Sequence, residues 1–582
     1  MGGLLDDLNQ EQRRAVEVGD GPVCIVAGPG TGKTKTLTTR IAHLISSGQA
    51  QPDQILALTF TKKAAEEMQL RVGALLASEV RHSAPRISTF HALCHELLGS
   101  RARFATESER LQIVKQLPKS SIYKGVSSRE LGLLISRAKN MAEDEPELHS
   151  LVHAYNAGLQ ELGLMDFDDL LVNTRDLLQH DAKVCSKVRS QFTQILVDEF
   201  QDTNRLQYEL LQLLRGTDNV FVIGDPLQSI YGFRGASGDI FEQFRADFPQ
   251  AADITLTTNY RSAAKLVMLS NSLFMDSPDL RPYTVNEGRV RAVQVLNEYS
   301  EAAWVLAEIQ RAIGGGDMLQ AISDDDARMH RTLQDFAILY RNRATAIAMQ
   351  KAVQASGLPY QIVGDGSPYE QPKVQAIIAL LRSAYSGEPA QLKGFSAGQA
   401  KTIQNLLGQT KGVLPHALAE KIVELLGFET TVGLQHFIGT LVRFEDLESA
   451  VHYFDRIAET QFYDPDVDAI TLLTIHASKG LEFPHVFLIG VEEDILPYRG
   501  KGQRAFSGED EEKRLFYVAI TRAKEYLDML YTKKRGGQAS TASRFAAMLP
   551  EELLPHEVDP NLMSDQRRAV KRAVKRSQQS LF

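Results

Sequence analysis

A glycine-rich turn near the start of the chain holds the first residues whose types and spacing suggest chemistry. The stretch VCIVAGPGTGKTKTLTTR, residues 23–40, runs from an apolar segment through this turn into a helical pattern. Glycines let backbone N–H groups curl around phosphates, Lys33 can neutralise the outer phosphates, and the Thr34 hydroxyl can bind Mg²⁺. The turn consists of Ala27, Gly28, Pro29, Gly30, Thr31, Gly32, Lys33 and Thr34. Its place between a strand pattern and a helix pattern favours a nucleotide site over a turn without function.

An acidic pair at the end of a second apolar run, ILVDEFQD, supplies chemistry that a phosphate-binding turn lacks. Asp198 is placed to hold Mg²⁺, directly or through water, and Glu199 can orient and deprotonate an attacking water. Acidic pairs in loops are usually only solvated. The strand pattern before Asp198 favours the catalytic interpretation here.

Three further side chains are candidates for contacts with the terminal phosphate. Gln228, in VIGDPLQSIYGFRGA, follows another strand pattern and could sense this phosphate. Arg261, in LTTNYRS, and Arg522, in YVAITRAK, could come from a second domain. Planar guanidinium groups stabilise the charge on a transferring phosphoryl group and are worth roughly a thousandfold or more in rate. A single arginine is more often a surface residue, so the surrounding motifs decide this assignment.

Short apolar runs that recur between helical stretches must position these residues. Each run is bounded by Gly, Asp or Asn, as is typical of strands in a buried parallel sheet. The runs are PVCIVAG, ILALTF, QILVDEF, VFVIGD, DITLTTN, FAILYRN, AITLLTIHA and HVFLIGV. This alternation predicts an α/β fold. Phosphate-type motifs in both halves predict two such sheets facing a cleft.

Two regions interrupt the alternation, residues 101–178 and residues 382–459, and both have a helical pattern. We expect them to be helical insertions, one in each α/β domain. After ASRFAAML the chain is expected to be loop-like and to end in a short basic tail.

Bulk composition limits the class of protein. A chain of 582 residues exceeds one hydrophobic core, and 43% hydrophobic with 24% charged residues is ordinary for a folded protein. The net charge of -9 argues against a basic exterior that coats nucleic acid, but it permits a locally basic channel.

Cys24, Cys94 and Cys185 form neither a metal pattern nor a disulfide framework. With no signal-peptide pattern and no run long enough to span a membrane, we expect a soluble, cytoplasmic protein.

The order of motifs along the chain resembles the superfamily 1 DNA helicases of the UvrD, Rep and PcrA type. The similar segments run from residue 8 to residue 524. They are LNQEQRRAV, AGPGTGKT, LTFTKKAAEEM, ISTFHALC, VDEFQDTN, GDPLQSIYGFRGA, TTNYRS, LYRN, TIHASKGLEFPHVFLIGVEE and RLFYVAITRAK. This resemblance implies two RecA-like domains with ATP bound between them.

The resemblance also implies domain boundaries. Residues 1–98 and 179–260 would form the first RecA-like domain, with 99–178 as its helical insertion. Residues 261–381 and 460–545 would form the second, with 382–459 as a reduced helical insertion. Residues 546–582 would be a flexible basic tail.

The resemblance assigns further contacts to the nucleotide. Gln12 would read the adenine, Tyr260 would stack on the base, and Glu482 would approach the ribose. Lys35 stands where many relatives carry arginine, which puts a stacking contact to the base in doubt. Lys33, Thr34, Asp198, Glu199, Gln228, Arg261 and Arg522 keep the roles given above.

Single-stranded DNA would be bound by residues in motifs that face the strand in relatives. These are Phe60, His91, Tyr231, Phe233, Arg234, Arg341 and His476. Aromatic rings stack on any base at roughly 1 to 3 kcal/mol each, which permits movement without sequence preference. Isolated aromatic residues usually pack in a core. Their motif positions favour DNA contact for Phe233 and Phe60, and less strongly for Tyr231.

The resemblance implies an ATP- and Mg²⁺-dependent translocase and helicase that travels 3′ to 5′ and acts in repair or replication at single/double-strand junctions. The second insertion is shorter than in larger relatives, where it contacts the duplex. One alternative is therefore a translocase that displaces proteins from single strands and needs a partner to unwind.

The C-terminal segment SDQRRAVKRAVKRSQQSLF suggests two more contacts. Pairs of basic residues recur every four positions, so a helix could bind DNA phosphates with one side, although a merely soluble tail is an alternative. The last residues, Gln578, Gln579, Ser580, Leu581 and Phe582, resemble the peptide by which bacterial proteins dock on the DNA polymerase sliding clamp. A second alternative is accordingly a nucleotide-gated DNA-binding scaffold tethered to the clamp.

Overall fold

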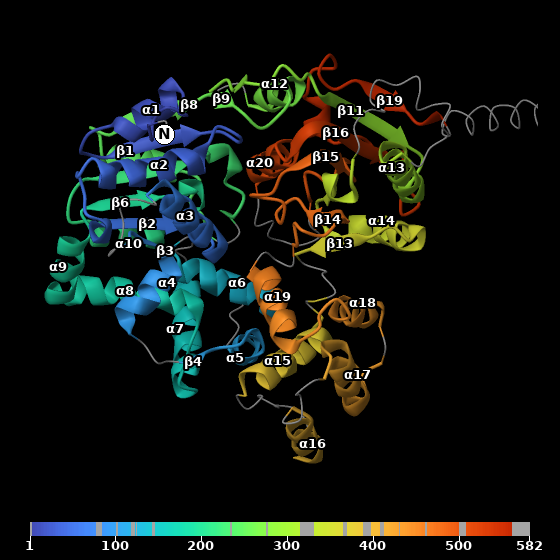
Figure 1. The fold of residues 1–582 in the computed structure, drawn as a ribbon, viewed down its shortest axis with the longest axis horizontal. Coiled ribbons are helices and arrows are strands. Elements are labelled where there is room, and N and C mark those ends of the chain that lie inside the picture. Colours follow the sequence, from blue (N-terminus) through green and yellow to red (C-terminus); the bar gives the residue numbers. More distant parts are fainter. Residues whose placement is uncertain are drawn as a thin grey trace, which may run out of the picture. The chain divides into compact units, whose positions relative to one another are not determined.

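A computed structural model gives the structure of the chain (Figure 1). Contacts divide the chain into two units, residues 1–287 with 500–521 and residues 288–499 with 522–582. The structure describes residues 3–76, 84–99, 103–117, 123, 125–141, 146–232, 235–274, 278–314, 331–364, 369, 371–387, 397–407, 413–429, 431–459, 463–499 and 508–560. Each unit is built around its own parallel sheet.

The first unit contains a six-stranded sheet in which all neighbouring strands are parallel (Figure 1). In spatial order its strands are β3 (Arg86–Thr89), β2 (Ile55–Thr59), β6 (Gln194–Val197), β7 (Val220–Gly224), β1 (Val23–Ala27) and β8 (Ala252–Leu256). The carboxyl ends of β6, β7 and β1 are therefore neighbours at one edge of the sheet. All three strands precede sequence motifs that carry polar side chains.

Helices cover both faces of this sheet, which explains why its strands are apolar throughout. Successive strand residues point to opposite faces, so Cys24 packs in one apolar core and Ile25 in the other. One face is covered by α1 (Gln10–Glu17), α2 (Lys33–Ser46) and α3 (Lys62–Leu75). The other is covered by α4 (Phe90–Leu98), α8 (Phe167–His180), α9 (Ala182–Gln191), α10 (Arg205–Leu214) and α11 (Ile240–Asp247).

A helical group with its own core interrupts this unit. Its helices are α5 (Glu107–Gln116), α6 (Ser128–Lys139) and α7 (Pro146–Glu161). Two short strands, β4 (Arg103–Phe104) and β5 (Leu164–Met165), pair beside it. A buried ion pair joins α6 to the start of α8, because the Lys139 ammonium lies 2.9 Å from Asp166 and 2.7 Å from Asp169.

The second unit contains a seven-stranded parallel sheet. In spatial order its strands are β13 (Tyr360–Val363), β14 (Ile470–Thr474), β12 (Phe336–Tyr340), β15 (Phe483–Leu488), β16 (Ala523–Thr532), β11 (Arg289–Val295) and β19 (His556–Val558). Helices α13 (Glu298–Ala312) and α14 (Arg343–Ser356) pack on one face of this sheet. The two parallel sheets with packed helices confirm the expected α/β class.

A second helical group forms a separate core within the second unit. Its helices are α15 (Pro372–Ser386), α16 (Ala397–Leu407), α17 (Pro415–Leu426), α18 (Val432–Leu441) and α19 (Leu447–Glu459). The helical patterns that interrupt the strand alternation in the sequence thus correspond to helical structure.

All eight apolar runs that predicted strands are strands, whereas several other strands were not anticipated. The strand β16 carries Lys524, Glu525 and Asp528, which made it look unlike a buried strand. Asp528 is fully buried because Arg291 and His485 pair with it at 2.6 and 2.8 Å. The strand β19 lies in the segment that was expected to be a loop-like tail, and it pairs with β11.

The division into units differs from the expected boundaries in two places. Residues 261–287 and the helix α20 (Glu509–Ile520) belong to the first unit, although the sequence suggested that both belong to the second domain. The reason is local packing, since α20 contacts both α12 (Ala264–Leu273) and the short helix η4 (Pro226–Gln228). No helix within the described ranges combines the length and apolar character that a membrane crossing requires.

Candidate active site

The glycine-rich turn between β1 and α2, residues 28–32, forms the centre of the candidate site. Gly30 and Gly32 have φ of 70° and 85°, a conformation that favours glycine. A Cβ on Gly30 would lie 2.6 Å from Cβ of Arg261, and one on Gly32 would lie 2.6 Å from Nε2 of Gln12. Close packing by other segments therefore excludes side chains here. We call residues 27–34 the phosphate loop.

The start of α2 offers free hydrogen-bond donors. Its N-cap is Gly32, which supplies no side-chain acceptor to the first-turn N–H groups. Such orphan donors at the positive end of the helix dipole attract an anion. The Lys33 ammonium folds back over the loop and donates to the carbonyls of Ala27 at 3.0 Å and Gly28 at 3.3 Å. These residues together fit a phosphate group.

Two buried amide side chains fix the shape of the phosphate loop from outside. Gln12 donates from Nε2 to the carbonyl of Thr31 at 2.9 Å. Asn259 donates from Nδ2 to the carbonyl of Pro29 at 2.8 Å, and its Oδ1 accepts from the backbone N–H groups of Arg261 and Ser262 at 2.9 Å each. Asn259 therefore links the phosphate loop to the turn that carries Arg261.

The predicted Asp198 and a second aspartate, Asp225, lie at adjacent strand ends. Asp198 follows β6, and its Oδ1 accepts from the backbone N–H of Glu199 at 3.0 Å. Asp225 follows β7, and its Oδ2 accepts from Nε2 of Gln228 at 2.7 Å. Gln201 connects the two groups, because it donates to Glu199 and its Oε1 accepts from the backbone N–H of Asp225.

Burial sets the protonation behaviour of these carboxylates. Burial and the neighbouring Glu199 raise the pKa of Asp198 to about 7, while Lys33 acts in the opposite direction. Burial also raises the pKa of Asp225, and Lys33 again opposes this. Because Lys33 acts on both groups, its ammonium lies within electrostatic reach of both strand ends. A cation beside Asp198 would favour the charged form.

Glu199 has an unusual backbone conformation for a residue with a side chain. Its φ is 49° and its ψ is 46°, in the left-handed region. This conformation costs free energy and persists only where the surroundings impose it. Glu199 is the N-cap residue of the short helix η3 (Phe200–Asp202). The turn displays the Glu199 side chain at the strand end.

The residues expected at the base and at the γ-phosphate are distributed over both units. In the first unit Arg261 follows Tyr260, whose backbone N–H donates to Gly30 at 2.8 Å and whose hydroxyl accepts from Asn9 at 2.8 Å. Lys35 donates to the carbonyl of Asp7 at 2.6 Å, so its ammonium already has a backbone partner. Arg261 was expected from the second domain, and its place in the first unit corrects that expectation.

The second unit holds the other predicted residues. Arg522 is 1% exposed and donates to the carbonyl of Leu481 at 3.0 Å. Glu482 pairs with Lys524 at 2.7 Å. Arg341 at the end of β12 lies over the ring of Tyr498 at 5.1 Å, and His476 follows β14.

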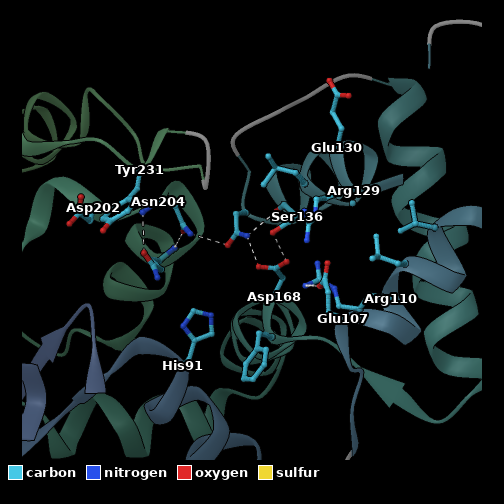
Figure 2. Close-up of a pocket in the computed structure, with 18 of the residues that line it drawn as sticks. His91, Glu107, Arg110, Arg129, Glu130, Ser136, Asp168, Asp202, Asn204 and Tyr231 are labelled. Atoms are coloured by element: carbon cyan, nitrogen blue, oxygen red, sulfur yellow. Dashed lines mark hydrogen bonds and ion pairs between the residues drawn. The ribbon is translucent and has the colours of Figure 1, made fainter. Parts of the chain in front are cut away.

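A cavity of about 910 Å³ in the first unit brings three of the predicted DNA contacts together (Figure 2). Phe60 and Tyr231 stack with ring centroids 5.3 Å apart and planes 12° apart. His91 lines the same cavity, and burial lowers its pKa. The opposite wall is formed by the helical group and includes Arg110 and Arg129.

A chain of hydrogen bonds crosses this cavity from the helical group to the acidic motif. Figure 2 shows Asp168 beside Ser136, which donates to it at 2.7 Å. Asn140 also donates to Asp168 at 2.7 Å and accepts from Nδ2 of Asn204 at 2.9 Å. Asn204 stands six residues after Asp198 in the chain. The cavity wall is thus connected by a hydrogen bond to the segment that follows Asp198.

The predicted DNA contacts Phe233 and Arg234 lie outside the described part of the chain. The basic C-terminal segment and the peptide at its end also lie outside it, and this peptide consists of Gln578, Gln579, Ser580, Leu581 and Phe582.

Sequence reasoning missed Asp225, Gln201 and Asn259. Asp225 ends an apolar run just as Asp198 does, so the same signal could have found it. The motif TTNYRS contains Asn259, but only the fold shows that its amide reaches Pro29. The motif VDEFQDTN likewise contains Gln201, but only the fold shows that its side chain joins Glu199 to Asp225.

Two family models together match most of the chain. The model of the UvrD/REP helicase N-terminal domain matches residues 8–143 and 127–249. The model of the UvrD-like helicase C-terminal domain matches residues 254–389 and 454–534. The second match leaves out residues 390–453, which contain most of the second helical group.

Individual relatives agree with these matches. The ATP-dependent DNA helicase PcrA of Staphylococcus aureus (strain COL) is 28% identical over 660 aligned positions, which cover 95% of this chain and 88% of the relative. The ATP-dependent DNA helicase PcrA of Staphylococcus epidermidis is 29% identical over 662 positions, with the same coverage.

Proposed function

The chain belongs to the family of UvrD/PcrA-type DNA helicases, which are DNA-dependent ATPases, and on that premise we propose that it translocates 3′ to 5′ along single-stranded DNA and unwinds duplex ahead of it. One observation carries the proposal. Lys33, the acidic strand ends and Gln228 converge at one edge of the parallel sheet, beside a helix N-terminus with free donors. This arrangement suits phosphoryl transfer from ATP to water.

The phosphate loop would hold the triphosphate. Its N–H groups and Lys33 supply the positive charge, and Asn259 and Gln12 keep the loop in the required shape. Tyr260 would stack on the base, and Glu482 would approach the ribose. Lys35 already has a partner in Asp7, which supports a base site without a stacking cation from this position.

The residues present fit a magnesium ion. Mg²⁺ prefers oxygen ligands and is commonly held by one or two carboxylates together with substrate phosphates. Asp198 and the Thr34 hydroxyl provide such oxygens, and the raised pKa of Asp198 indicates a carboxylate that a cation would stabilise. When bound, Mg²⁺ would neutralise charge on the phosphate oxygens. In the described part of the chain, no cluster of three or more acidic, His or Cys residues suits a metal on its own.

Hydrolysis would then depend on protein side chains. Glu199 would orient and deprotonate the attacking water, since its constrained turn displays the carboxylate at the strand end. Gln228 would sense the terminal phosphate, and Arg261 and Arg522 would stabilise the charge that develops on it. We propose that closure of the domains around ATP and reopening after hydrolysis move the protein along its strand.

Single-stranded DNA would be bound in the cavity that is lined by Phe60, His91 and Tyr231. Phe60 and Tyr231 lie in contact with each other, so a base that stacks between them must first separate the rings. His91, whose pKa is lowered, would present a neutral ring to the DNA. Arg341, His476, Phe233 and Arg234 would complete the contacts. Action on DNA would place the protein in the cytoplasm with the nucleoid, in repair or replication.

The experiment is ATP hydrolysis with and without oligo(dT), combined with unwinding of duplexes that carry a 3′ or a 5′ tail. We expect DNA-stimulated hydrolysis and unwinding of the 3′-tailed duplex only. The Glu199→Gln variant should bind ATP but lose both activities. The proposal would be contradicted by a rate of ATP hydrolysis that is the same with and without DNA, or by preferential unwinding of the 5′-tailed duplex.

Two alternative functions predict different results in these assays and in two further measurements. DNA-stimulated hydrolysis without unwinding, together with removal of a bound protein from single strands, would favour a translocase that needs a partner. The reduced second helical group motivates this alternative. Full biological activity of Glu199→Gln would instead favour a nucleotide-gated scaffold on the sliding clamp.

A further inference from the structure

The helix α20 occupies a special position in the chain. It belongs to the first unit, but the chain passes from the second unit before it and returns to the second unit at Arg522, two residues after its end. Within the first unit it packs against α12 and against η4, the short helix that contains Gln228.

Two side chains of α20 hold the backbone that follows Gln228. We call residues Ser229–Gly232 the Tyr231 loop. Glu511 accepts from the N–H of Gly232 at 3.1 Å, and Nε of Arg514 donates to the carbonyl of Ser229 at 2.8 Å. A Cβ on Gly232 would lie 2.7 Å from the Glu511 carboxylate, so a side chain here would require this carboxylate to shift.

The contacts are made by charged groups, a buried carboxylate on Glu511 and a half-buried guanidinium on Arg514. Glu511 is 8% exposed, and hydrogen bonds to an ionised group are roughly twice as strong as neutral ones. Burial raises the pKa of Glu511, while Arg514 and the Gly232 N–H act against this. On the other side of the loop, Arg137 of α6 donates to the carbonyl of Gly232. The Tyr231 loop is therefore fixed from two directions.

The Tyr231 loop connects the two halves of the proposed function. Gln228 lies directly before it and is hydrogen-bonded to Asp225. Tyr231 within it stacks on Phe60 in the cavity of about 910 Å³ that is proposed to bind DNA. Lys513 and Tyr517 of α20 line a separate cavity of about 460 Å³ that reaches Gly28 and Asp225. One helix thus contacts the loop and also lies beside the phosphate site.

We propose that Glu511 and Arg514 are positioning residues that couple ATP hydrolysis to DNA binding, because they tie the Tyr231 loop to the helix that leads into Arg522. If α20 shifts when Arg522 contacts the terminal phosphate of ATP, Ser229 and Gly232 would move with this helix. The stacked Phe60–Tyr231 pair would then change with the state of the nucleotide. This inference depends on the proposed function of the chain as a DNA-dependent motor.

The test uses the full chain with Glu511→Ala, which removes the acceptor, and Glu511→Gln, which keeps an acceptor oxygen. At saturating oligo(dT) we expect kcat of Glu511→Ala to fall about tenfold while KM for ATP stays within about twofold, because ground-state binding is untouched. The number of nucleotides travelled per ATP should fall as well. Glu511→Gln should recover most of the stimulated rate.

Asp510→Ala is the matched control, since Asp510 is an exposed carboxylate on the same turn of α20. It should leave the stimulated rate unchanged. A merely structural role of Glu511 would lower the rates with and without DNA in the same proportion, and that result would overturn the proposal. A fully stimulated Glu511→Ala enzyme would overturn it too.

A second variant, Gly232→Ala, tests the same contact alone and in combination with Glu511→Ala. Gly232→Ala disturbs the same contact from the loop side, and in the Glu511→Ala background the added methyl has room. We expect the double variant to be no worse than either single variant, because contacting residues are not additive. Additive losses would overturn the proposal. If the wild-type chain shows no stimulation by DNA, the proposed function itself fails; if only the variants behave as wild type, the inference alone fails.

Discussion

At the scale of single residues, the candidate site concentrates buried charge near the sheet edge. Asp198 and Asp225 are both buried and both have raised pKa values, opposed by Lys33. Keeping such carboxylates in a protein interior costs stability unless a cation compensates them. Their presence at one strand edge is typical of a functional site.

The raised pKa of Asp198, about 7, gives a pH-dependent prediction. In the unfolded chain the pKa would be about 3.9, so the folded form binds the proton more tightly. The stability that protonation contributes is present at low pH and is lost as pH rises toward 7. Asp198→Asn should therefore melt about 5 °C higher than wild type at pH 8 without Mg²⁺, and the difference should shrink toward pH 5.

Differential scanning calorimetry or fluorimetry at both pH values checks this prediction. Asp510→Asn, at an exposed carboxylate, should show no pH-dependent difference from wild type. Added Mg²⁺ should reduce the increase in melting temperature that Asp198→Asn causes at pH 8. An equal difference in melting temperature between variant and wild type at both pH values would contradict the raised pKa of Asp198.

At the scale of elements, the phosphate loop depends on packing as well as on its own sequence. Gly30 and Gly48 have nearly the same φ, 70° and 72°, but their surroundings differ. A Cβ on Gly30 would meet Arg261 and Asn259, whereas a Cβ on Gly48 would meet nothing within 4 Å. Substitutions at these two glycines therefore distinguish the free-energy cost of a left-handed backbone, which both share, from the cost of a steric clash, which only Gly30 would have.

Gly48→Ala should lower the free energy of unfolding by about 1 to 2 kcal/mol, the cost of the left-handed conformation, and leave ATP hydrolysis unchanged. Gly30→Ala should also raise KM for ATP at least about tenfold, because its methyl displaces Asn259 from Pro29. Steady-state kinetics and thermal melts of both variants provide the comparison. Equal KM values in the two variants would show that the Asn259 contact does not shape the loop.

At the scale of the whole molecule, the predicted site residues are divided between the units. The phosphate loop, the acidic residues and Arg261 lie in the first unit, and Arg522 and Glu482 lie in the second. A complete site of the proposed kind therefore needs both units. The C-terminal peptide, in contrast, is a short linear segment whose proposed contact needs neither sheet.

Deletion of residues 578–582 tests whether clamp binding is independent of the ATP site. We expect the shortened chain to keep DNA-stimulated hydrolysis within about twofold and to lose binding to the DNA polymerase sliding clamp, since such a peptide binds through its own few side chains. Surface plasmon resonance against immobilised clamp measures the binding. Clamp binding that persists after the deletion would assign it to another surface.

The sequence by itself was enough to determine the α/β class, the family and the position of the phosphate loop. These features depend on local units, a strand followed by a turn and a helix, in which residue type and spacing already fix the geometry. The eight strands that it predicted are short, apolar and bounded by turn residues. Strand β16 escaped detection because it carries charged residues, and the burial of one of them, Asp528, depends on a partner far away in the chain, Arg291.

Only the tertiary structure placed Arg261 in the first unit, set Asn259 against Pro29 and packed α20 on the Tyr231 loop. These contacts join residues separated by 230 positions for Asn259 and Pro29 and by 279 positions for Glu511 and Gly232. No local pattern encodes a contact over such a separation, because it forms only after independent elements have packed. The residues that could cleave ATP were therefore visible in the sequence, whereas those that could couple cleavage to DNA were determined by packing.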